Sequence, residues 1–131
     1  MISMLIVSHS KKIAEGTKEM AGQMVSGKVK IEAIGGMEDG RMGTDASQIA
    51  LAIQKLFSDD GVLVFYDLGS SMMSSEMAIE SLPEIMREKV LLVHAPLVEG
   101  AVIAAVEISI GKGLHKIKSE LEKMKPDKSS W

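Results

Sequence analysis

Short apolar runs alternate along the chain with longer segments in which apolar residues recur at helical spacing. Four runs predict β-strands, at residues 3–8, 28–33, 61–66 and 89–94. Three of them are continuously apolar at their centres, which is typical of strands covered by helices on both faces. The run at 28–33 alternates between apolar and polar residues, and this pattern predicts the edge strand.

The segments between the strands predict helices. In the first, Ser10 is a plausible N-cap and Gly27 is well placed to end the helix. The second begins near Asp45, which has capping-box spacing to Gln48, although Thr44 could be the cap instead. The remaining predicted helices run from about Met72 or Ser75 to Leu82, over 97–110 and over 113–124.

Alternating strands and helices indicate a single α/β domain with a doubly wound, mainly parallel four-stranded sheet in the order 2-1-3-4 and helices on both faces. A chain of 131 residues fits one such domain. We expect the domain to span 1–124 and residues 125–131 to form a flexible tail. The helix at 97–110 is apolar nearly all round, so it must be buried in this subunit or against another.

Composition excludes several classes of protein. The chain has no cysteine, so it has no disulfide, thiolate zinc site or thiol nucleophile. Its net charge is −3, and it contains only one Trp, one Tyr and two Phe, which argues against binding to nucleic acid. The N-terminal residues lack the features of a secretory signal, and no apolar run could span a bilayer. We therefore expect a cytoplasmic protein without membrane contact, metal or cofactor.

Candidate chemistry lies just beyond two of the strands. In a doubly wound sheet of this order, ligands gather beyond the carboxyl ends of the first and third strands. His9 follows the first strand and Asp67 follows the third, so the topology brings an imidazole and a carboxylate together. If Asp67 accepts the Nδ1–H of His9, Nε2 faces outward with a free lone pair and His9 becomes a nucleophile.

The surroundings predicted for His9 suit an anion. Ser8, Ser10, Lys11 and Lys12 flank it, and the first helix begins there with unpaired N–H groups. Phosphoryl is the obvious candidate. The alternative interpretation is that His9 has only a structural role, as a hydrogen-bonded side chain at the end of a buried strand.

The sequence gives less evidence of a chemical role for the other two histidines. His94 ends the fourth strand, but the sequence places no carboxylate at the corresponding point of the neighbouring strand. We therefore expect a structural or peripheral role for His94. His115 lies on the polar final helix and is expected to be solvated.

The Gly-rich segment 35–45 is long for a strand-to-helix connection, and it is either a flexible turn or a loop folded over the His9 crevice. Arg41 and Met42 stand where a Walker motif needs Lys and Ser or Thr, which disfavours a nucleoside triphosphate site. Gly43 and Thr44 could instead supply N–H and hydroxyl donors to a phosphoryl group. The segment that follows Asp67 could do the same through Ser70 and Ser71.

The chain contains eleven methionines, most of which we expect to fill a core that is poor in aromatic residues. Met37, Met42, Met72 and Met73 fall in predicted loops or helix starts. There, flexible thioethers could provide a docking surface for several partners.

An ordered set of motifs resembles a known family. These motifs are "MLIVSHS", the "GG", "DG" and "GT" pairs of the second loop, "VLVFYDLGSS" and "APLVEGA". Together they resemble the phosphotransfer subunits (DhaM) of phosphoenolpyruvate-dependent dihydroxyacetone kinases, which belong with the mannose-type enzyme IIA domains. The resemblance covers roughly residues 3–115.

The resemblance implies a function. His9 would accept phosphoryl from the carrier protein HPr and pass it to ADP held on the nucleotide-binding kinase subunit, with Asp67 orienting the imidazole. Gly43 and Thr44 match the family's "GT" pair, whereas Asp45 stands where a serine is expected and is better explained as a helix cap. A homodimer is implied as well. Some relatives carry further phosphotransfer domains behind this one, so here the upstream kinase and carrier would be separate proteins.

Three alternatives remain open. A sugar-specific enzyme IIA domain would use the same histidine but pass phosphoryl to a cysteine of a IIB partner. A receiver-like module would use Asp67 as acceptor, yet "SHSKK" lacks the acidic pair that holds magnesium. A flavin-binding module would need aromatic cover that this chain scarcely has.

Overall fold

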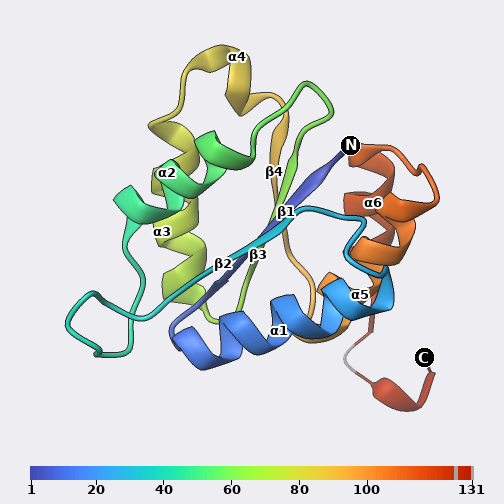
Figure 1. The fold of residues 1–131 in the computed structure, drawn as a ribbon, viewed down its shortest axis with the longest axis horizontal. Coiled ribbons are helices and arrows are strands. Elements are labelled where there is room, and N and C mark those ends of the chain that lie inside the picture. The colour runs from blue at the N-terminus through green and yellow to red at the C-terminus, as the bar shows by residue number, and fades with distance from the viewer. Residues whose placement is uncertain (126, 131) are drawn as a thin grey trace.

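The computed structural model describes residues 1–125 and 127–130, and its core is one four-stranded parallel sheet in the order β2-β1-β3-β4 (Figure 1). The strands are β1 (Ser3–Ser8), β2 (Ile31–Gly35), β3 (Val62–Tyr66) and β4 (Val90–Val93). The predicted fold class and strand order are therefore confirmed. All four strands run in one direction, so their carboxyl ends lie along the same edge of the sheet.

Helices cover both faces of the sheet (Figure 1). One layer contains α1 (Lys11–Met24), α5 (Leu97–Ser109) and α6 (Leu114–Leu121), and the other contains α2 (Ala46–Leu56) and α3 (Gly69–Glu80). Two short helices complete the described chain, α4 (Glu84–Arg87) and the 3₁₀ helix η1 (Lys128–Ser130). None of the helices in the described part of the chain is long and apolar enough to cross a membrane.

Alternation along the strands divides the core into two clusters. Met4, Ile6 and Phe65 pack under α1, α5 and α6, whereas Leu5 and Val64 pack under α2 and α3. All five side chains are fully buried. Because successive residues of a strand point to opposite faces, continuously apolar strands supply both clusters at once.

Several predicted boundaries were wrong. Strand β2 runs from Ile31 to Gly35 rather than over 28–33, because pairing with β1 aligns Met4 with Ile31 and Ser8 with Gly35. Helix α3 begins at Gly69, earlier than the apolar pattern indicated, and α4 was not predicted. The expected tail, 125–131, includes residues 126 and 131, which lie outside the described residues. In the described part of the tail, Lys128 Nζ lies 2.9 Å from Glu99 Oε2.

Gly35 allows the end of β2 to lie close against the start of α1. A Cβ atom at this position would lie 2.6 Å from the carbonyl oxygen of Ser10 and 2.9 Å from Cα of Lys11. Both are backbone atoms, so a side chain could be accommodated only by moving the start of α1. Gly16, within α1, has nothing within 4 Å of the corresponding point.

We expect Gly35→Ala to lower the free energy of unfolding by about 1–3 kcal/mol, the usual cost of overpacking. Gly16→Ala is the matched control and should raise it by about 0.5–1 kcal/mol, because alanine is the better helix former. Urea unfolding of the two variants and the wild type measures both effects. Equal stability of the two variants would contradict the close approach at Gly35.

Candidate functional site

His9 occupies the turn between β1 and α1, and Asp67 lies between β3 and α3. Strands β1 and β3 are neighbours and Val7 pairs with Tyr66, so Ser8 is level with Asp67 and His9 follows one residue further along. His9 and Asp67 are both partly buried, with side chains 20% and 17% exposed. The structure therefore brings together the two residues that the sequence placed at the crevice, and their chemical roles remain predictions.

The carboxylate of Asp67 receives hydrogen bonds from five groups. Its Oδ1 lies 2.9 Å from His9 Nδ1 and accepts from the hydroxyl of Ser71 at 2.8 Å and the N–H of Leu68 at 2.7 Å. Its Oδ2 accepts from the hydroxyl of Ser8 at 2.7 Å and the N–H of His9 at 3.0 Å. These bonds fix Asp67 to β1, to α3 and to the histidine itself.

Two opposing effects set the pKa of Asp67. Partial burial raises the pKa, but the hydrogen bonds from Ser8, His9 and Ser71 outweigh burial and hold the pKa well below its ordinary value of 3.8. The carboxylate is therefore ionised and can only accept, which assigns the proton of the imidazole to Nδ1. Nε2 is then the unprotonated nitrogen, which carries the lone pair of the ring.

Nε2 of His9 faces the first turn of α3, where it is hydrogen-bonded to the hydroxyl of Ser70. Ser70 is exposed, so this contact lies at the surface. Helices α1 and α3 both begin beside His9, and neither has an acidic residue in its first turn. Their first N–H groups have no acceptor within the helix, so both helix ends favour an anion at this point.

The predicted phosphate-contacting residues fall into two groups. Ser8 and Ser71 are fully buried and their hydroxyls are directed at Asp67. Ser10 caps α1, where its side chain accepts the N–H of Ile13 at 3.3 Å. Ser70 alone among the four serines contacts Nε2. Sequence reasoning did not separate these serines, because the separation depends on which ones turn inward from the strand ends.

The loop after β2 is tied to the histidine. The N–H of Gly43 donates to the carbonyl oxygen of His9 at 2.9 Å, and the hydroxyl of Thr44 donates to that of Ser74 on α3 at 2.8 Å. Asp45 accepts the N–H of Ser47 at 2.9 Å and is the N-cap of α2, as the sequence predicted. The loop therefore lies beside His9 and the first turns of α3.

His94 has partners that sequence reasoning missed. Its Nδ1 lies 2.6 Å from the hydroxyl of Tyr66, and its backbone N–H donates to Glu122 Oε2 at 3.0 Å. Burial and the charges of Glu122 and Glu76 raise the pKa of Tyr66. The carboxylate near His94 comes from the end of α6 rather than from a neighbouring strand, so strand spacing gave no signal for it. His115 is exposed on α6, as expected.

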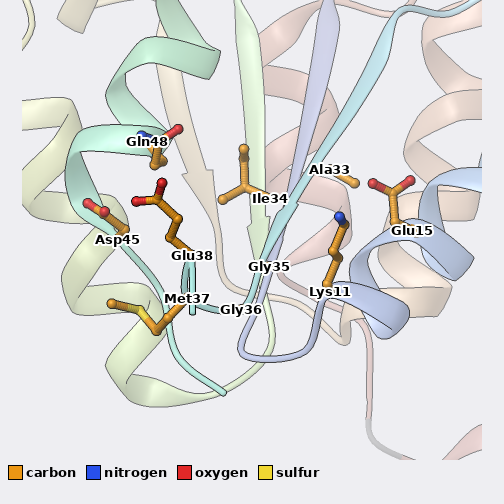
Figure 2. A pocket seen from close by; sticks show the side chains of 10 residues that line it. All are labelled: Lys11, Glu15, Ala33, Ile34, Gly35, Gly36, Met37, Glu38, Asp45 and Gln48. Atoms are coloured by element: carbon orange, nitrogen blue, oxygen red, sulfur yellow. The ribbon is translucent and has the colours of Figure 1, made fainter. Parts of the chain in front are cut away.

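A cavity of about 390 Å³ opens at the end of β2 and the start of α1, and His9 is not among the residues that line it (Figure 2). Lys11 and Glu15 of α1 lie on one side of it, and Glu38, Asp45 and Gln48 lie on the other. Within the described residues, no group of three or more His, Asp or Glu side chains is placed to hold a metal ion.

Comparisons with known proteins indicate the family to which this chain belongs. Residues 3–118 match the EIIA-man family model, described as the fructose IIA component of the phosphotransferase system. A phosphoryl donor subunit DhaM of Listeria innocua is 43% identical over 92% of this chain and 97% of its own length. A DhaM of Lactococcus lactis is 37% identical over 92% of this chain and 93% of its own length.

Two further matches differ in extent. The Escherichia coli DhaM is 40% identical over 89% of this chain, which corresponds to only 25% of that longer protein. The crystal structure of EF1359, a protein of unknown function, superposes with a TM-score of 0.86 at 39% identity and covers 97% of each chain. This chain therefore belongs to the mannose-type EIIA family.

Ionisation of Asp67 predicts how stability depends on pH. Because the pKa of Asp67 is lower in the folded protein than its ordinary value of 3.8, the folded state binds fewer protons than the unfolded state. The stabilisation is therefore present above the ordinary value and is lost as the pH falls through the folded value.

We expect Asp67→Asn to lower the free energy of unfolding at about pH 7, by an amount that begins to shrink only below about pH 4 and keeps shrinking as the pH falls toward the folded pKa of Asp67. Denaturant unfolding of both proteins across this range measures the difference. Asp39→Asn, at an exposed loop carboxylate, is the matched control. A constant difference between wild type and Asp67→Asn at every pH would contradict the prediction.

Proposed function

We propose that this chain is the phosphoryl donor subunit of a phosphoenolpyruvate-dependent dihydroxyacetone kinase. It would accept phosphoryl from phospho-HPr on His9 and transfer it to ADP bound on the nucleotide-binding kinase subunit, in the cytoplasm. The observation that carries the proposal is the contact between His9 Nδ1 and an ionised Asp67, which leaves Nε2 available beside two helix N-termini. The DhaM relatives supply the choice of system.

The first transfer begins with attack of the Nε2 lone pair on the phosphorus of the donor's phosphohistidine. A new P–N bond forms to His9, the donor's P–N bond breaks, and its electron pair returns to the donor imidazole. The ring of His9 becomes positively charged and keeps its proton on Nδ1. The Asp67 carboxylate at 2.9 Å stabilises that charge.

The second transfer reverses these roles. A terminal phosphate oxygen of ADP attacks the phosphorus, the P–Nε2 bond breaks, and its electron pair returns to Nε2, which gives ATP and neutral His9. During both transfers the hydroxyl of Ser70 and the first N–H groups of α1 and α3 would bind the phosphoryl oxygens. We assign Ser8 and Ser71 to holding Asp67, and Ser10, Gly43 and Thr44 to the rim of the phosphoryl site.

Phosphorylation by phosphoenolpyruvate, the general kinase and HPr tests the nucleophile. We expect one acid-labile, base-stable phosphate by mass spectrometry, and we expect His9→Ala to abolish it. His94→Ala is the matched control and should be phosphorylated normally, because His94 faces Tyr66 rather than the crevice. Asp67→Ala should slow transfer, and a wild-type rate would contradict the orienting role of Asp67. Label on the His9→Ala protein would overturn the proposal.

The labelled protein also distinguishes the acceptors. Incubation with the ADP-loaded kinase subunit should produce labelled ATP, whereas incubation with a IIB domain should leave the label on this chain. Transfer of the label to the IIB domain instead would identify a sugar-specific enzyme IIA.

We also propose that the protein is a homodimer and that α5 forms part of the interface between the two copies. Ile103, Val106 and Ile110 follow one another at i, i+3 and i+7 and so form an apolar stripe, with exposed fractions of 37%, 37% and 69%. Burial of this stripe against a second copy would remove it from water.

We expect the wild type to sediment as a dimer and Val106→Asp to sediment as a monomer, because a buried unpaired carboxylate is costly. Leu51→Asp places the same charge on the exposed face of α2 and should leave the mass unchanged. A monomeric wild type would overturn the dimer.

A further inference from the structure

An exposed apolar stripe continues along α3 from the serine that contacts the nucleophile. Ser70, Met73 and Met77 are spaced at i, i+3 and i+7, so they lie along one face of the helix. Met73 and Met77 are 64% and 63% exposed, and Leu68, directly before the helix, is 62% exposed. Leu68, Met73 and Met77 are called the α3 ridge below.

We propose that the α3 ridge is the docking surface for the protein that donates phosphoryl to His9. The occupant is a phosphorylated carrier protein with an apolar patch around its own phosphorylated side chain. This inference rests on the proposed function and adds the surface through which the first transfer occurs.

Proximity to Nε2 is the first argument. The hydroxyl of Ser70 is hydrogen-bonded to Nε2, and Met73 and Met77 lie about 4.5 and 10.5 Å further along the helix axis. A specific interface buries about 800 Å² on each partner. A donor protein that brings phosphorus to Nε2 therefore covers the neighbouring turns of α3.

Charge is the second argument, because the surfaces that suit the phosphoryl donor and the ADP-loaded acceptor differ in charge. Lys11 and Lys12 are exposed in the first turn of α1, which covers the opposite face of the sheet from α3. Exposed charged residues on α3 are Glu76 and Glu80. An ADP-loaded acceptor brings further phosphate groups, which favours the α1 side. A carrier that brings only the transferred phosphoryl group suits the apolar ridge.

Side-chain chemistry is the third argument. The sequence suggested Met72 and Met73 as docking residues. Met72 is half-buried and packs against the core, so it is not available to a partner. Met73 is exposed, and so is Met77, which the sequence did not suggest. Exposed methionine side chains leave apolar surface in contact with water, and a partner can bury that surface. Their flexibility lets them adapt to the shape of the partner. Such a surface suits a contact that must form and dissociate in every cycle.

The test compares two methionine pairs of the same spacing. Met73→Ala/Met77→Ala removes most of the ridge, and Met20→Ala/Met24→Ala alters a pair on α1 that is 53% and 59% exposed. The rate of His9 phosphorylation is measured against the concentration of phosphorylated HPr. We expect the half-saturating concentration to rise about tenfold for the ridge pair, equivalent to about 1.4 kcal/mol, with an unchanged rate at saturation. The α1 pair should match the wild type.

Two controls keep the result interpretable. Met73→Leu/Met77→Leu retains apolar surface and should restore most of the wild-type concentration dependence, which a simple folding defect would not permit. Thermal unfolding of each variant at the same temperature as the wild type establishes that the variant is folded. Transfer from phosphorylated His9 to the ADP-loaded subunit should be unaffected by the ridge pair.

Three outcomes would overturn the proposal: an unchanged half-saturating concentration for the ridge pair, an equal increase for the α1 pair, or a defect confined to transfer to ADP. In each of them the wild type is still phosphorylated on His9, so the proposed function stands. A wild type that accepts no phosphoryl from HPr would refute the proposed function and this inference together.

Discussion

The carboxylate of Asp67 is the group on which the site depends. It accepts hydrogen bonds from the end of β1, from the start of α3 and from both the backbone and the ring of His9. A carboxylate with so many donors has little freedom to rotate, and it stays ionised. These hydrogen bonds together determine the position of the imidazole, the nitrogen that carries its proton and the nitrogen that contacts Ser70.

The fold supplies this arrangement through strand order. Strands β1 and β3 are neighbours although 53 residues lie between Ser8, at the end of β1, and Val62, at the start of β3, because the crossover through β2 returns the chain to the other side of β1. Parallel pairing then places the residues after both strands at one edge. Close contact between Gly35 and the start of α1 adds a second restraint on the turn that holds His9.

Much of this could be predicted from the sequence. Continuous apolar runs define three of the strands, and the strand order follows from the doubly wound pattern, so the proximity of His9 and Asp67 followed from topology alone. The inward turn of Ser8 and Ser71 could not be predicted, because residues of one type at a strand end give no signal of which way they point. The early start of α3 was missed because Gly69, Ser70 and Ser71 are poor helix formers, and the contact of Glu122 with His94 depends on how α6 returns across the sheet.

The number of donors around Asp67 has a consequence for proton balance. A base that already accepts five hydrogen bonds and whose pKa lies far below neutrality would not take up the Nδ1 proton if phosphorylation made the ring of His9 cationic. That proton would remain on His9 through gain and loss of the phosphoryl group. The site would then move phosphorus between partners without exchanging protons with water, so any acid or base required by the final acceptor must come from the acceptor's own subunit.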